Sequence, residues 1–184
     1  MDAFLTSTGL VALAEMGDKT QLLAIILATR FKKPWPIVWG ILLATLLNHA
    51  LAGAVGTWVT TLLAPDTLRW ILVAGFVGMG VWTLFPDKQD DNPPDTGKWG
   101  VFATTVLVFF LAEMGDKTQL ATVAIAAQYS HFLPVVLGTT LGMMLANVPV
   151  VFMGERLTRV LPLRVLRWGA SALFFVFAGW VAYS

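Results

Sequence analysis

The decapeptide LAEMGDKTQL occurs twice without change, at Leu13–Leu22 and at Leu111–Leu120. Both copies lie inside long apolar segments, so each places a glutamate, an aspartate and a lysine where the sequence otherwise resembles membrane interior. One such charge costs about 2.5–3.5 kcal/mol to insert on the translocon scale, and six cost roughly 15–20 kcal/mol before any pairing. Charged residues inside a membrane mostly serve function, and the repeated decapeptide therefore predicts a functional site.

Composition places the chain among membrane proteins. It has 184 residues, of which 57% are hydrophobic and 12% charged, with no cysteine and a net charge of +1. Soluble domains have about 25% charged residues. The absence of cysteine excludes disulfides and thiolate metal sites, and the small net charge gives no support for a nucleic-acid partner. The first residues lack the basic region of a signal peptide, so we expect the first apolar segment to remain as a helix.

Six apolar segments are long enough to cross a bilayer, which takes roughly 20 residues each. Polar and proline-containing breaks separate them, and the decapeptide lies in the first and the fourth. We expect transmembrane helices near Ala3–Thr29, Trp35–Leu63, Thr67–Phe85, Trp99–Gln128, Phe132–Met153 and Leu163–Tyr183.

The two halves of the chain repeat at a constant offset of 98 residues. Beyond the decapeptide, Pro36 matches Pro134, Gly40 matches Gly138, Leu68-Arg69-Trp70 matches Leu166-Arg167-Trp168, and Trp82 matches Trp180. Each half has three helices, an odd number, so the second half must enter the membrane upside down. Secondary transporters with such inverted repeats bind substrate near the midplane between the halves. The predicted fold is an all-α integral membrane protein of two inverted three-helix repeats, residues 1–85 and 99–184, joined by a linker at 86–98.

Basic residues indicate the orientation, because loops rich in lysine and arginine stay in the cytoplasm. One side of the predicted bundle holds almost all of them, so this side and the linker should be cytoplasmic and both termini outside. These residues are Arg30, Lys32, Lys33, Lys88, Lys98, Arg156, Arg159 and Arg164. The linker also carries four aspartates that could sense cations, but a solvated tether is favoured because polar, proline-rich linkers rarely hold a fixed geometry.

The spacing within the motif places its charges together. On a continuous helix, Asp18 and Lys19 share one face with Glu15, and the second copy repeats the arrangement. If the copies face each other, four carboxylates and two lysines leave a net charge of −2, which one divalent cation neutralises. Carboxylates suit Mg²⁺, Ca²⁺ and Mn²⁺. The predicted metal ligands are Glu15, Asp18, Glu113 and Asp116.

Lys19 and Lys117 each follow the glutamate of their own copy by one helical turn. We expect them to pair with it and to hold the empty site near neutrality. Carboxylates without metal can take protons, so one site could carry either a divalent cation or two protons. Thr20 and Thr118 have two interpretations: a hydrogen bond to the i−4 carbonyl, or a ligand oxygen.

Neutral polar residues near the motif are further candidate ligands. Asn48 and Asn147 could offer carbonyl oxygens to the ion or only bond between helices, and Gln21 and Gln119 lie to the side of the aspartates. For His49, helix packing or hydrogen bonding is favoured over ligation.

The small and sulfur-containing residues of the motif also have two interpretations. Gly17 and Gly115 either let helices approach closely or mark an unwound turn whose carbonyls face the ion. Met16 and Met114 either fill packing gaps or offer a thioether that would favour Mn²⁺ over Ca²⁺.

Glu15–Thr20 and Glu113–Thr118 resemble a duplicated Glu-x-Gly-Asp-Lys/Arg-Ser/Thr signature. It marks the small cation/proton antiporters of the lysine-exporter superfamily, which include bacterial manganese exporters of the MneA type and organellar manganese and calcium transporters. The resemblance covers nearly the whole chain. It implies export of Mn²⁺ from the cytosol against protons, with the four motif carboxylates as ligands and no cofactor. Without an organelle-targeting extension, the chain is expected in a bacterial inner membrane.

Two alternatives stay open from the sequence. A Ca²⁺/H⁺ antiporter would use the same ligands, and a divalent-cation channel could select ions with a ring of carboxylates. The inverted repeat favours alternating access over a channel. An enzyme is not expected, because the apolar segments hold no distinctive arrangement of serine or cysteine with histidine.

Overall fold

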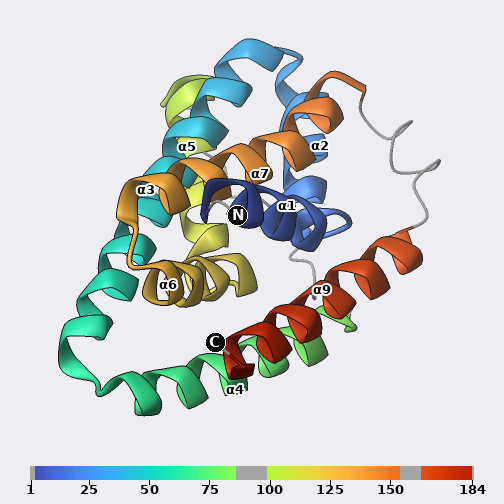
Figure 1. Cartoon of the computed structure of the whole chain (residues 1–184). Helices are drawn as coiled ribbons and strands as arrows, with labels where there is room; N and C mark the ends of the chain where they lie inside the picture. Colours follow the sequence, from blue (N-terminus) through green and yellow to red (C-terminus); the bar gives the residue numbers. More distant parts are fainter. Residues whose placement is uncertain (1–2, 86–98, 154–162, 184) are drawn as a thin grey trace.

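The computed structural model describes residues 3–85, 99–153 and 163–183 (Figure 1). Across these residues the chain forms eight helices and no strand. Prolines begin α3 and α4, where the missing N–H costs no hydrogen bond. The helices are α1 (Ala3–Glu15), α2 (Lys19–Phe31), α3 (Pro34–Leu62), α4 (Pro65–Thr83), α5 (Gly100–Glu113), α6 (Lys117–Tyr129), α7 (Phe132–Met153) and α9 (Leu163–Tyr183).

The helix lengths confirm an all-helical protein with apolar helices suited to a membrane. α3, α7 and the Arg164–Tyr183 part of α9 are long and apolar enough to cross a bilayer, and α1 and α5 are shorter apolar helices. The expected single helices at Ala3–Thr29 and Trp99–Gln128 are instead two helices each, α1 with α2 and α5 with α6. The linker 86–98 and two basic residues of the orientation argument, Arg156 and Arg159, lie outside the described residues.

Two repeat-equivalent pairs of helices pack alike. α1 lies along α7, and its counterpart α5 lies along α3. Glycines permit the close approach: a Cβ added at Gly138 would lie 2.5 Å from the carbonyl oxygen of Phe4, and one at the equivalent Gly40 would lie 2.6 Å from Cβ of Thr105. These contacts bring the helix breaks of the two decapeptides to the middle of the bundle.

The bundle has two ends, which we name after aromatic residues. At the Tyr129 end, α6 ends while α1 and α7 begin, and the Tyr129 hydroxyl donates a hydrogen bond to Thr6 Oγ1 at 3.2 Å. At the Phe31 end, α2 and α7 end while α3 and α5 begin, and the rings of Trp35 and Phe152 meet edge to face at 5.5 Å.

The third helices of the two repeats, α4 and α9, form an antiparallel pair along one side of the bundle (Figure 1). The rings of Phe76 and Phe174 stack between them at 6.5 Å. Ser171 Oγ also donates a hydrogen bond to the carbonyl of Gly80 at 2.7 Å. The two helices therefore form one unit.

Apolar side chains cover much of the outside, while polar side chains are buried within. Trp39, Trp58 and Trp168 are each more than half exposed, and many leucines, valines and phenylalanines are exposed with them. Water-soluble monomers rarely expose large contiguous apolar surfaces. The distribution therefore suits a protein surrounded by lipid.

Candidate metal centre

Both decapeptides are broken helices. α1 ends at Glu15 and α2 begins at Lys19, with Gly17 between them at φ +82°; Gly115 takes φ +75° at the equivalent break. Glycine adopts this left-handed region without the clash that a Cβ causes. The prediction of a continuous helix through the motif is therefore wrong, and each glycine lies in an unwound turn; that the carbonyls of this turn face the ion stays a prediction.

The breaks bring carboxylates together inside the apolar bundle. Glu15, Glu113 and Asp116 are buried, and each can offer one oxygen such that all three lie within 4.8 Å of one another. Asp18, the fourth predicted ligand, is also buried. Its carboxylate is held by an ion pair with Lys117. We call Glu15, Glu113 and Asp116 the carboxylate triad.

The motif lysines form ion pairs between the two copies. Lys117 Nζ lies 2.8 Å from Asp18 Oδ1, and Lys19 Nζ lies 3.1 Å from Asp116 Oδ1. The sequence predicted pairing within each copy, between lysine and glutamate, and that prediction depended on a continuous helix. The break at the glycine removes the i, i+4 geometry and aims each lysine across the interface. The ion pairs therefore tie the two halves together.

The threonine that follows each lysine binds the glutamate of its own copy. Thr20 Oγ1 donates to Glu15 Oε2 at 2.5 Å, and Thr118 Oγ1 donates to Glu113 Oε2 at 3.0 Å. The sequence offered a bond to the i−4 carbonyl or a ligand oxygen, and neither describes this contact. The other oxygen of each glutamate, Oε1, is buried without a hydrogen-bond partner. Buried polar atoms almost always have one, so these two oxygens are suited to a cation.

The glutamines support the broken turns. Gln21 Oε1 accepts a hydrogen bond from the Gly17 N–H at 3.0 Å, and Gln119 Oε1 accepts one from the Gly115 N–H at 2.7 Å. Each side-chain oxygen therefore supports the unwound segment through one of its two lone pairs. Both residues were candidate ligands, and that role stays a prediction.

The amide nitrogens of the glutamines reach different partners in the two halves. Gln21 Nε2 donates to the carbonyl of Ala146 at 3.0 Å, whereas Gln119 Nε2 donates to Asn48 Oδ1 at 3.1 Å. Asn48 Nδ2 in turn donates to the carbonyl of Phe110 at 3.0 Å. Asn48 thus connects α3 to the second break, which is the interhelical role that the sequence left open.

His49 and Asn147 occupy equivalent positions at the offset of 98, and both are fully buried. Asn147 Nδ2 donates to the Met143 carbonyl at 3.1 Å, while its Oδ1 and both ring nitrogens of His49 have no hydrogen-bond partner. From the sequence, Asn147 was grouped with Asn48 as a candidate ligand, and its equivalence with His49 was overlooked. The offset alone could have revealed it.

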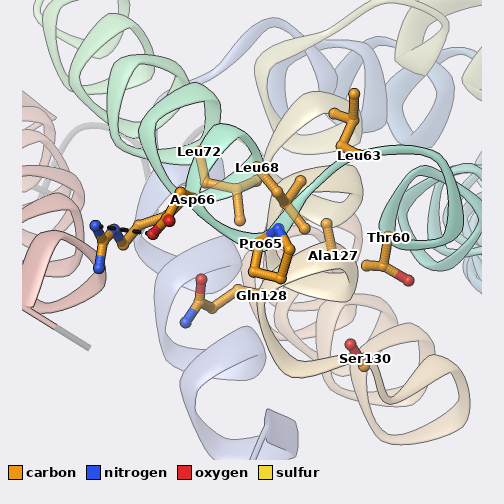
Figure 2. Close-up of a pocket in the computed structure, with 10 residues that line it drawn as sticks. Thr60, Leu63, Pro65, Asp66, Leu68, Leu72, Ala127, Gln128 and Ser130 are labelled. Carbon is orange, nitrogen blue, oxygen red and sulfur yellow. Dashed lines mark ion pairs between the residues drawn. The ribbon is translucent and has the colours of Figure 1, made fainter.

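A pocket of about 460 Å³ lies at the Tyr129 end, away from the triad (Figure 2). It is bordered by the turn between α3 and α4 and by the end of α6. The ion pair of Asp66 with Arg69, at 3.2 Å, lies along it. No residue of either decapeptide lines it, so this pocket is not the candidate metal centre. Its lining includes Thr60, Leu63, Pro65, Leu68, Leu72, Ala127, Gln128 and Ser130.

Buried carboxylates and ion pairs at the centre of an apolar helical bundle are typical of membrane ion transporters. The family model described as divalent cation/proton antiporter GDT1 matches residues 3–91 and 101–184. The chain therefore belongs to the GDT1 family of divalent cation/proton antiporters, which confirms the resemblance found in the sequence. This is a family of transporters and not a class of enzymes.

Curated relatives agree over nearly the full length. A Vibrio cholerae protein named "Putative manganese exporter" is 48% identical over 97% of this chain and 89% of its own length. A GDT1-like protein of Synechocystis is 27% identical over 97% of the chain and 95% of its own, and GDT1-like protein 5 of Arabidopsis thaliana is 25% identical over 96% and 93%. No solved structure matches the chain.

Proposed function

We propose that this protein exports Mn²⁺ from the cytosol in exchange for protons, and that the ion binds at the carboxylate triad. The family supplies the reaction, a divalent cation exchanged for protons. The name of the Vibrio cholerae relative favours Mn²⁺, and because the oxygen ligand set suits Mn²⁺ and Ca²⁺ alike, Ca²⁺ is the alternative. The observation that carries the proposal is the position of three buried carboxylates within 4.8 Å of one another.

The triad has the dimensions of a site for a hard cation. Ca²⁺ binds oxygen at 2.3–2.6 Å, so two opposite ligands of one ion lie at most about 5 Å apart. The unpartnered Oε1 atoms of Glu15 and Glu113 supply two donors, and Asp116 supplies a third. Asp18 acts in this proposal through its ion pair with Lys117, as a charge partner of the site.

The charges explain how metal and protons are coupled. The pairs Lys19–Asp116 and Lys117–Asp18 are each neutral overall, which leaves the charges of Glu15 and Glu113 uncompensated. A doubly negative site inside an apolar bundle is costly. One divalent cation or two protons would neutralise it equally. The empty, charged site is therefore disfavoured, and this penalty links release of one substrate to binding of the other.

The proposed arrangement in the membrane has six crossings, formed by α1 with α2, α3, α4, α5 with α6, α7 and α9. The odd number per repeat makes the two halves inverted, with the triad near the midplane. The Phe31 end carries Arg30, Lys32, Lys33 and Arg164, so we place it in the cytoplasm and both termini outside. The family of the Vibrio cholerae relative makes the bacterial inner membrane the proposed location.

Purified protein in liposomes tests the proposal. We expect saturable uptake of Mn²⁺ that an imposed pH gradient drives, and competition that ranks Mn²⁺ above Ca²⁺ and Mg²⁺. Transport that ignores the pH gradient would exclude exchange for protons. A preference for Ca²⁺ would replace Mn²⁺ as the substrate, and a flux that does not saturate would favour a channel. Asp66→Asn is the control, because its side chain is 88% exposed and outside the site.

A further inference from the structure

Three polar side chains of α3 and α7 are buried without a hydrogen bond: Thr45, His49 and Thr140. Thr45 and His49 are 0% exposed, and Thr140 is 5% exposed. The hydroxyl oxygens of both threonines and both ring nitrogens of His49 have no hydrogen-bond partner among the described residues. Buried polar atoms almost always have one. We call these three residues the His49 cluster.

The packing of α3 against α7 brings the cluster together. The two helices run in opposite directions, and a Cβ added at Gly53 of α3 would lie 2.8 Å from Cγ2 of Val136 of α7. His49 lies one turn before Gly53, and Thr140 lies one turn after Val136, so each lies on the same face as that contact. His49 and Thr140 are therefore at the same level of the α3–α7 interface, and Thr45 is one turn beyond His49.

The cluster adjoins the second helix break. Asn48, the neighbour of His49 in α3, accepts a hydrogen bond from Gln119 Nε2 at 3.1 Å. Gln119 in turn accepts a hydrogen bond from the Gly115 N–H at 2.7 Å, and Asp116 of the triad follows Gly115 in the chain. Two hydrogen bonds thus connect α3, at the residue before His49, to the segment that carries Asp116.

The other half of the chain has different residues at the equivalent place. The counterparts of Thr45, His49 and Thr140 at the offset of 98 are Met143, Asn147 and Leu42. Asn147 Nδ2 contacts both the carbonyl of Met143, at 3.1 Å, and its sulfur, at 2.9 Å. The nitrogen of Asn147 is therefore bonded, whereas neither nitrogen of His49 is.

Packing alone does not account for a histidine in this position. An apolar side chain of similar volume would fill the same space without burying unbonded nitrogens, which is unfavourable. The sequence favoured packing or hydrogen bonding for His49, and among the described residues the hydrogen bond is not formed. A metal ion that binds a ring nitrogen would provide the missing partner.

The carboxylate triad leaves room for a neutral ligand. It offers three carboxylate residues, whereas Mg²⁺ and Ca²⁺ take about six to eight ligand atoms. A neutral imidazole adds a ligand atom without adding charge. The proposed balance between one divalent cation and the charges of Glu15 and Glu113 is therefore kept.

We propose that His49 is a further ligand of the transported ion and the residue that favours Mn²⁺ over Ca²⁺. Ca²⁺ takes oxygen ligands, whereas imidazole nitrogen suits transition-metal ions. The ring is not among the groups that lie within 4.8 Å of one another in this structure, so it reaches the ion by rotation about its side-chain bonds. The inference rests on the proposed binding of Mn²⁺ at the triad and adds a ligand to that site.

Thr140 has a positioning role in this arrangement. A histidine that binds a metal through one ring nitrogen almost always donates the N–H of the other to an acceptor. Thr140 offers a buried, unpartnered hydroxyl oxygen on the facing helix at the level of His49. Such a bond would fix the ring's orientation and tautomer.

Pulsed electron paramagnetic resonance of bound Mn²⁺ tests the proposal directly, because the chain has only two histidines. The protein is purified without a histidine tag, with isotopically labelled histidine, and is loaded with Mn²⁺ in detergent. We expect hyperfine coupling to a histidine nitrogen in the wild type and in His131→Asn, and none in His49→Asn. His131 is the matched control because it is exposed.

The outcomes separate this inference from the proposed function. Mn²⁺ bound to the wild type without coupling to a histidine nitrogen would overturn the inference and leave Mn²⁺ transport standing. Coupling that persists in His49→Asn would overturn it as well. A wild type that binds Ca²⁺ but not Mn²⁺ would refute both. The wild-type spectrum is decisive without any variant, so the test holds even if His49→Asn fails to fold.

Competition between the two ions tests the selectivity. His49→Asn copies Asn147 and offers an amide oxygen in place of the nitrogen. We expect its affinity for Mn²⁺ to fall about 10-fold or more, as changes around metal ligands do, and its affinity for Ca²⁺ to change little. An equal loss for both ions would show that His49 is a structural residue and overturn the proposal, and His131→Asn should change neither affinity.

Discussion

The two copies of the decapeptide are identical in sequence and differ in surroundings. Lys117 is buried with Asp18, whereas the side chain of Lys19 is 29% exposed. Gln119 Nε2 donates to the side chain of Asn48, whereas Gln21 Nε2 donates to the backbone carbonyl of Ala146. Ten identical residues cannot encode these differences. They arise from residues outside the motif: Asn48, for example, has Ala146 as its repeat equivalent, so the side-chain partner of Gln119 has no counterpart in the other half.

The features that both copies share are properties of the motif, whereas the features that differ depend on the surrounding residues. Both copies break at a glycine of positive φ, both threonines donate to the glutamate, and both lysines pair with the opposite aspartate. These contacts are local or lie on the interface between the halves. The exposure of the lysines differs because different residues outside the motif surround the two copies. The predictions below test this division, beginning with the largest effect.

Removal of either glutamate should abolish transport to the same extent. Glu15→Gln and Glu113→Gln each take a charge and a donor from the triad, and we expect a loss of more than about 100-fold, since even outer-shell partners of metal ligands contribute 10–100-fold. Uptake of Mn²⁺ into liposomes measures it, with Asp66→Asn as the control. If one variant transports normally, the two glutamates do not share a site.

Removal of the lysines should have unequal effects on stability. Lys117→Met leaves Asp18 charged in a buried environment and should cost about 3 kcal/mol. Lys19→Met should cost less, about 2 kcal/mol, because Lys19 is 29% exposed although its partner Asp116 is buried. Unfolding in detergent compares the two variants. Equal losses would mean that the difference in exposure has no energetic consequence.

The glycines of the breaks should behave alike. Gly17→Ala and Gly115→Ala force a Cβ into the left-handed region, at about 1–2 kcal/mol each. Gly9→Ala is the matched control, because Gly9 lies within α1, has no atom within 4 Å of an added Cβ and should gain up to about 1 kcal/mol. Melting temperatures in detergent provide the comparison. A stabilising Gly115→Ala would show that the turn is not needed.

The smallest effect is expected at Asn48. Its repeat equivalent is Ala146, so Asn48→Ala makes α3 resemble α7 at this position. The variant loses the bonds to Gln119 and to the Phe110 carbonyl, and should cost about 1 kcal/mol. Detergent unfolding measures this as well. A loss as large as that of Lys117→Met would give Asn48 a direct part in the site.

The sequence predicted the helical class, most helix boundaries and the family, because apolar segment length and an exact repeat are local signals. α7, for example, begins and ends at the residues expected, Phe132 and Met153. The continuous motif helix was wrong because a single glycine can either pack or unwind, and local sequence does not decide between them. The pairing of each lysine with the opposite copy could not be foreseen, since it depends on how two distant segments meet.

The sequence by itself determined that charged groups are duplicated inside an apolar chain and that the two halves are equivalent. Those statements follow from residue identities and from the offset of 98. Only the tertiary structure decided which carboxylates form the triad and which charges pair. The physical reason is that burial and ion pairing are properties of contacts between distant segments. Two identical copies of the motif therefore have different surroundings once the chain folds.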